Sequence, residues 1–171
     1  MKKIIAVFIF LFVCLFSSAQ INRTILGCTI GESTLSQVKQ TLKSQGIKLK
    51  YEKNADAYIY ISDNKFVSFG GVNWNGVGFY FKNDRLYQVQ FQYLIGGENH
   101  LRERDFTRAL ENKYARYKQE VETPAGAHYT KFYRDNTKMV VAFTCYPGYC
   151  ILQYFDDKVF DRIANENSDE L

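Results

Sequence analysis

Apolar and polar residues alternate along most of the chain, and this period of two predicts strands rather than helices. Asn, Asp and Gly residues typical of turns divide the alternating runs. We therefore expect strands over residues 48–52, 57–61, 65–69, 77–93, 127–133, 139–145 and 150–155. Aromatic residues make up 16% of the chain, and because they favour strands they support a protein that is mostly sheet.

The segment 77–93 contains a hairpin that turns about Asn83 and Asp84. A two-residue loop would place the apolar residues of its two arms on opposite faces of the sheet. A three-residue loop that also includes Arg85 would place them on one face, so we expect the longer, bulged turn.

Helical spacing interrupts the strands in three places. Thr34 and Gln37 form a capping box before a helix over 35–45, and Gly46 is placed to end it. Asn99 can cap a second helix. The apolar stripe of this second helix is Phe106, Ala109, Leu110, Tyr114 and Tyr117. A short third helix is expected from Lys158 to about Ala164.

The order of these elements is helix then strands, twice over. It predicts one α+β domain in which helices pack on one face of an antiparallel sheet. Two αβββ-type halves are expected, over about 25–95 and 99–165.

The N-terminus has the three parts of a secretory signal peptide. Lys2 and Lys3 precede the apolar run Ile4–Phe16, and Ser17-Ser18-Ala19-Gln20 supplies small residues for cleavage. We expect residues 1–19 to be removed after Ala19. The mature chain, 20–171, would then be a single domain that is periplasmic or secreted.

The charge balance argues against a nucleic-acid partner. Loss of Lys2 and Lys3 lowers the basic count from 22 to 20 against 18 acidic residues, so the mature net charge is +2. No basic run suggests a nucleic-acid patch. No stretch after Ala19 is apolar enough to span a membrane.

Several motifs of the first half carry a resemblance to a known family. They are Ile25-Leu26-Gly27 followed by Gly31, Thr34-x-x-Gln37-Val38-x-x-x-Leu42, and Phe79-x-Phe81-x-x-x-x-Leu86-x-x-Val89. This arrangement resembles the repeat of small exported bacterial proteins with the β-lactamase-inhibitor-protein-like fold, which includes small outer-membrane assembly lipoproteins. Exported Bacteroidetes proteins of unknown function have a comparable opening. The resemblance implies a protein that binds other proteins and lacks catalytic residues. Asn99-His100-Leu101 departs from the usual opening of the repeat.

The cysteines suggest a disulfide. Cys14 lies in the signal peptide, which leaves Cys28, Cys145 and Cys150. If Pro147-Gly148 forms a hairpin tip, Cys145 and Cys150 face each other as a non-hydrogen-bonded pair, which suits a structural disulfide. A redox pair, or pairing of Cys28 with one of the two, are the alternatives.

Few residues suggest catalysis or metal binding. His100 and His128 are the only histidines, and neither has a ligand partner at metal-binding spacing. Asp156, Asp157 and Asp161 crowd one segment, where they could bind a cation or lie at the start of a helix. We expect no metal and no cofactor.

One loop has the composition of a sugar-binding site. Asn73, Trp74 and Asn75 lie between glycines, and an exposed Trp ring could stack on a sugar. The alternative is that Trp74 packs into the core while the Asn residues shape turns. Tyr146 and Tyr149 offer a second aromatic contact.

The sequence therefore predicts a non-catalytic extracytoplasmic binding module with another extracytoplasmic protein as its partner, in an inhibitory, assembly or accessory role. A glycan-binding module built on the Trp74 loop is the alternative. A thiol-based enzyme using Cys28 or the Cys145/Cys150 pair is a more remote one.

Overall fold

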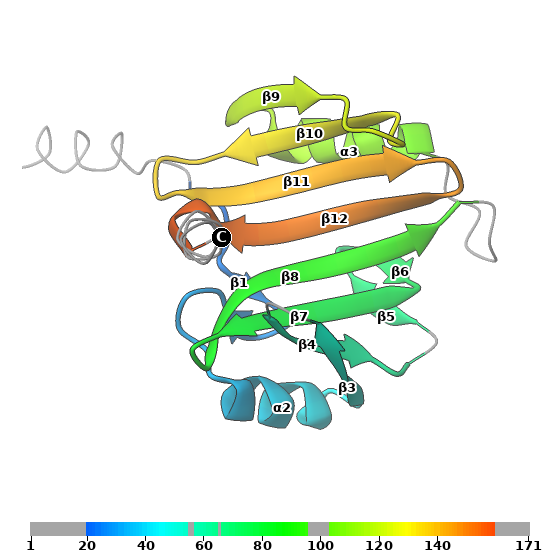
Figure 1. Cartoon of the computed structure of the whole chain (residues 1–171). Helices are drawn as coiled ribbons and strands as arrows, with labels where there is room; N and C mark the ends of the chain where they lie inside the picture. The colour runs from blue at the N-terminus through cyan, green and yellow to red at the C-terminus, as the bar shows by residue number, and fades with distance from the viewer. Residues whose placement is uncertain (1–19, 55–56, 65, 96–102, 160–171) are drawn as a thin grey trace, which may run out of the picture.

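The computed structural model describes residues 20–54, 57–64, 66–95 and 103–159. Its main feature is an eight-stranded antiparallel sheet (Figure 1). The strands, in spatial order, are β3 (Leu49–Asn54), β4 (Ala57–Ser62), β7 (Gly76–Lys82), β8 (Arg85–Leu94), β12 (Tyr149–Asp156), β11 (Met139–Tyr146), β10 (Tyr129–Arg134) and β9 (Lys118–Glu122).

The strand order is symmetric about the middle of the sheet. Helix α2 (Leu35–Ser44) precedes β3, β4, β7 and β8, and helix α3 (Glu103–Tyr114) precedes β9 to β12. The last strands of the two halves, β8 and β12, pair antiparallel at the centre, with Tyr93 opposite Cys150. Each half therefore contributes four strands to one continuous sheet, rather than the expected three.

The expected α+β class, with helices packed on one face of the sheet, is wrong, because the structure is mostly β. The two described helices lie at opposite ends of the sheet (Figure 1) and do not form a layer across it. The middle of the core is closed by a small hairpin, β5 (Val67–Phe69) and β6 (Val72–Trp74), and by the N-terminal segment with β1 (Thr24–Ile25) and β2 (Cys28–Thr29). The sequence pattern did not show that short strands, rather than helices, cover the middle of the core.

Helix α2 confirms the capping-box prediction. The Thr34 side chain accepts from the Gln37 amide at 3.3 Å, and the Thr34 amide donates to Gln37 Oε1 at 2.9 Å. Gly46 follows the helix with φ +74°, a left-handed conformation that glycine adopts at little cost. The buried side chains of the helix are Val38 and Leu42.

The β7–β8 hairpin has a shorter loop than the three-residue loop expected from the sequence. Lys82 pairs with Arg85, so the loop holds two residues, Asn83 and Asp84, both with positive φ. The register then shifts between Tyr80 and Phe81. This bulge, rather than a longer loop, brings the apolar residues of both arms to the same face.

The expected short helix at 158–164 and the signal peptide at 1–19 fall mainly or wholly outside the described residues. Strand β9 was not predicted, since its sequence KQEVE is polar except for one valine.

Candidate functional site

Strands β11, β12 and β8 present a second face on the side away from the main core. Successive residues of a strand point to opposite faces, so the neighbours of core residues such as Phe91, Phe143 and Leu152 point outward. The strand register aligns these outward residues in rows across the sheet. They are Tyr146, Tyr149 and Leu94, then Thr144, Ile151 and Gln92, then Ala142, Gln153 and Gln90, and we call this set the outer face. Two of its residues, Thr144 and Ala142, are themselves buried.

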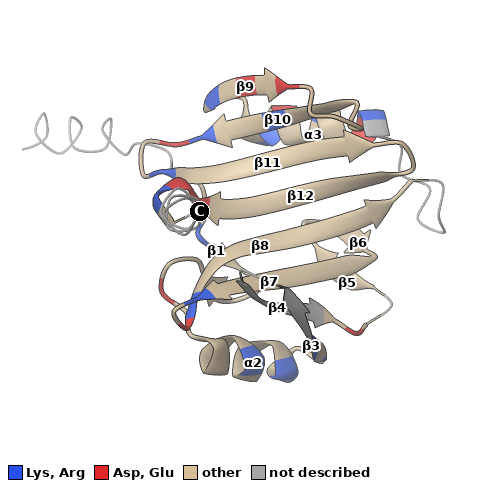
Figure 2. Ribbon diagram, viewed as in Figure 1, with Lys and Arg blue, Asp and Glu red and all other residues tan. Residues whose placement is uncertain are grey.

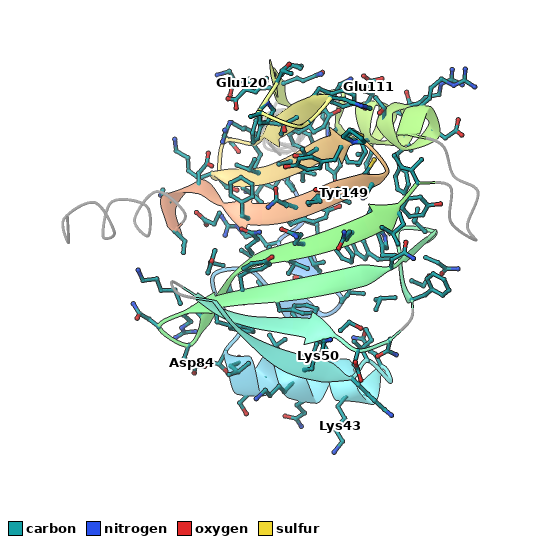
Figure 3. All side chains as sticks on the ribbon, turned by 45° about the vertical axis from the view of Figure 1, so that its right-hand side comes forward. Lys43, Lys50, Asp84, Glu111, Glu120 and Tyr149 are labelled. Atoms are coloured by element: carbon teal, nitrogen blue, oxygen red, sulfur yellow. The ribbon has the colours of Figure 1, made fainter. Side chains whose placement is uncertain are left out.

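Tyr146 and Tyr149 form the aromatic end of the outer face. They pair directly across the β11–β12 hairpin, beside the Pro147-Gly148 turn. Their rings are stacked, with centroids 4.7 Å apart and planes 13° apart. Leu94 pairs with Tyr149, and the Leu94 side chain is 46% exposed. Figure 3 labels Tyr149 on β12. Aromatic and apolar surface is thus presented to solvent at this end.

Glutamine side chains form the polar part of the outer face. Gln90 Oε1 accepts from Gln153 Nε2 at 3.1 Å and from Gln88 Nε2 at 3.4 Å. The first of these bonds joins β8 to β12, and so links the two halves of the chain. It also fixes the orientation of the amides, which leaves their remaining donors and acceptors in defined positions.

No residue of the outer face is charged. Figure 2 shows these strands uncoloured along their length, with charged residues at their ends and on the outer elements. At one end, Arg134 forms ion pairs with Asp157 and Glu120, whose Oε2 lies 3.2 Å from Arg134 Nε. The outer face is therefore a neutral surface with a charged boundary.

Trp74 does not lie at the surface. It is 2% exposed, its Nε1 donates to the Phe69 carbonyl at 3.0 Å, and its ring lies 5.2 Å from Phe91 and 5.3 Å from Phe106. No face of its ring remains for a sugar. This placement corrects the expectation that Trp74 forms a binding site and matches the alternative in which it packs into the core.

Asn73 and Asn75, on either side of Trp74, have different surroundings. Asn73 is exposed on β6. Asn75 is held by the sheet, because its amide donates to the Gln92 carbonyl and its Oδ1 accepts from the Leu94 amide at 3.0 Å. Asn75 thus fixes the end of β8, and the structure does not bring Asn73, Trp74 and Asn75 together as a ligand site.

Cys145 and Cys150 are brought together. They occupy paired positions of β11 and β12, both are buried, and their Sγ atoms lie 3.0 Å apart. The Cys28 thiol instead donates to the Leu26 carbonyl at 3.7 Å. Burial raises the pKa of Cys28 to about 11, so this thiol stays protonated at neutral pH and is a weak nucleophile. The Cys145–Cys150 disulfide stays a prediction.

The acidic segment is neutralised by arginine. Arg23 Nη1 lies 2.8 Å from Asp156 Oδ2, and Asp157 pairs with Arg134. Among the described residues, no group of three or more His, Cys, Asp or Glu side chains is placed to hold a metal ion. His100 and Asp161 lie outside the described residues, and His128 is exposed at the start of β10.

Comparison with known proteins gives no match: no family model, no curated protein and no solved structure is significantly similar to the chain. The resemblance to the β-lactamase-inhibitor-protein-like fold therefore stays a prediction. Within the described part of the chain, no helix has the length and apolar character needed to cross a membrane.

The sequence pointed to only part of the outer face. Alternation along β8 shows that Gln88, Gln90 and Gln92 share a face, and the hairpin at Pro147-Gly148 pairs the two tyrosines. Ile151, Gln153 and Leu94 were missed, because their place depends on the pairing of β8 with β12. Alternation along β12 was the available signal, but it does not identify the neighbouring strand.

Proposed function

We propose that the mature chain is an exported, non-catalytic binding module that contacts another extracytoplasmic protein through its outer face. The observation that carries this proposal is the composition of that face, which is neutral, bears stacked tyrosines and an exposed leucine, and lies on the central strands of the sheet.

The composition fits the centre of a protein interface. Interface cores are depleted of charged residues and enriched in tyrosine, and the polar rim lies outside them. The outer face shows the same order, with Tyr146 and Tyr149 on an uncharged surface and ion pairs such as Arg134–Asp157 at its boundary.

The outer face is also rigid before it binds. Its side chains stand on strands that are paired on both sides, and the ring stack and the Gln90–Gln153 hydrogen bond restrict several of them further. A partner therefore loses little affinity to the ordering of these groups, which is the usual advantage of a preformed surface.

Catalysis has less support. The buried, protonated Cys28 lacks the electropositive, partly exposed surroundings that activate a thiol. Cys145 and Cys150 are buried on strands rather than at a helix N-terminus. These features support a structural role for all three cysteines.

Site-specific photo-crosslinking in the native host tests the proposal. A photoreactive amino acid at exposed Gln92 should give a discrete adduct with another exported protein. The same group at exposed Asn136, in the β10–β11 turn, should not give that adduct. Equal labelling at both positions, or no adduct at Gln92, would contradict the proposal.

A further inference from the structure

A groove that is separate from the outer face lies between the last turns of α2 and the start of β3. Its volume is about 410 Å³, and the described residues that line it are Lys39, Lys43, Gly46, Ile47, Lys48 and Leu49. Figure 3 shows Lys43 on α2, on the opposite side of the molecule from Glu111 and Glu120. The volume falls in the lower part of the range for small-molecule sites, about 300–1,000 Å³.

The groove combines an apolar floor with a cationic rim. Ile47 and Leu49 supply the floor, and both are packed against the main core. Lys39 and Lys43 are four residues apart on α2, so they lie on one side of the helix. Lys48 adds a third ammonium group from the other wall, and none of the described lining residues is acidic. This charge pattern favours an anionic ligand.

The backbone along the groove is already hydrogen-bonded. The amides of Gly46 and Ile47 donate to the carbonyls of Lys43 and Leu42, and the Lys48 amide donates to Asn64 Oδ1 at 2.8 Å. Asn64 Nδ2 donates to the Gly46 carbonyl at 3.1 Å, and the Asp63 amide donates to the Lys48 carbonyl at 2.8 Å. All three amides over residues 46–48 are therefore already used, so an added peptide strand would find no amide there to pair with, whereas an acyl chain needs none.

We propose that this groove binds a single-chain anionic amphiphile, a free fatty acid, with its chain on Ile47 and Leu49 and its carboxylate among Lys39, Lys43 and Lys48. Lysine is suited to this arrangement because its methylene stem can cover the chain while its ammonium group stays in water. The inference does not depend on the outer face, since the two surfaces share no residue.

Titration of the protein, purified from the cells that export it, with medium-chain fatty acids below their micelle concentrations tests the proposal. Dodecanoate should shift the amide NMR signals of Gly46 and Ile47 in a saturable manner. From octanoate to dodecanoate the affinity should rise about fourfold for each added methylene that is buried, the equivalent of about 0.8 kcal/mol. Dodecyltrimethylammonium, which has the same chain and the opposite charge, should not bind.

Two paired variants locate the site. Lys39→Gln with Lys43→Gln removes two exposed charges, so the fold should persist while dodecanoate binding weakens at least tenfold. Lys113→Gln with Arg116→Gln, at a smaller cavity of about 170 Å³ near the C-terminal end of α3, should leave binding unchanged. Equal binding of the cationic amphiphile, shifts centred on residues 113–117, or binding of an acidic peptide but not of dodecanoate would each overturn the proposal.

Discussion

Cys145 and Cys150 face each other across the β11–β12 hairpin, with their sulfur atoms 3.0 Å apart in the buried core. In a two-residue hairpin closed by Tyr146 and Tyr149, the next pair along the strands is the non-hydrogen-bonded one, where side chains come closest. The two cysteines therefore follow the two tyrosines directly along the strands and lie at the base of that turn.

The first prediction is that the exported protein contains a Cys145–Cys150 disulfide. Each thiol loses a proton and an electron to an extracytoplasmic protein disulfide, which is reduced to a dithiol in exchange. The intact mass should be lower than that of the reduced chain by two hydrogen atoms, and peptide mapping should join the two strands. Removing the bond with Cys145→Ser and Cys150→Ser together should lower the free energy of unfolding by about 2–3 kcal/mol. A fully reduced pair in the exported protein would contradict this prediction.

The second prediction concerns Trp74, the only tryptophan of the chain. Because it is buried, iodide should quench the native fluorescence far less than that of the unfolded protein. Trp74→Ala should lower the free energy of unfolding by about 3–5 kcal/mol, measured by urea titration. Trp74→Phe keeps an aromatic ring and should cost clearly less. Strong quenching in the folded state would show that Trp74 is at the surface.

The third prediction is that the stability of the folded protein depends on pH through the thiol of Cys28. Burial raises the pKa of its thiol from the ordinary 9.0 to about 11 in the folded state. The folded protein therefore holds the proton more tightly than the unfolded chain does. The resulting stability is complete below about pH 9 and is lost as the pH rises towards 11.

Cys28→Ala isolates this effect from buried tyrosines such as Tyr133, whose pKa is raised to about 12. Urea midpoints should fall less steeply between about pH 9 and 11 in the variant than in the wild type. If the urea midpoint falls equally steeply with pH in the two proteins, Cys28 is not the source of the pH dependence of stability.

The fourth prediction tests how the N-terminal segment is attached. Arg23 Nη1 pairs with Asp156 at 2.8 Å and Arg23 Nη2 donates to the Thr137 carbonyl at 3.0 Å, while Asp156 is only 7% exposed. Arg23→Ala leaves this carboxylate without its cation and should cost about 1.5–3 kcal/mol of unfolding free energy. Lys118→Ala removes a more exposed pair with Glu120 and should cost less unfolding free energy than Arg23→Ala. Equal losses in the two variants would contradict the assigned role of Arg23.

The local features of the fold were accessible from the sequence because they depend on neighbouring residues. The capping box of Thr34 and Gln37 located α2, and alternation located the strands of the central sheet. Strand β9 was missed, since an edge strand can be polar on both faces, as Lys118–Glu122 is except for Val121. The fold class failed for a non-local reason, namely that the β5–β6 hairpin and the N-terminal segment close the middle of the core.

The candidate site was accessible only in part for the same reason. Proximity in sequence shows that Tyr146 and Tyr149 meet across a short turn. The Gln90–Gln153 contact joins residues 63 positions apart, and it exists because β8 and β12 pair at the junction of the two halves. The burial of Trp74 likewise depends on distant partners, Phe91 and Phe106, that local composition does not reveal.

The central claim, that the outer face binds a protein partner, is tested most directly by placing a charge at its centre while a photo-crosslinker at Gln92 reports contact. Ile151→Lys should abolish the Gln92 adduct, because a lysine there would be buried without a counter-charge in the interface. Val121→Lys, at a 58% exposed position of edge strand β9, should leave the adduct unchanged. With both variants shown to be folded by circular dichroism, an adduct that survives Ile151→Lys would contradict the account.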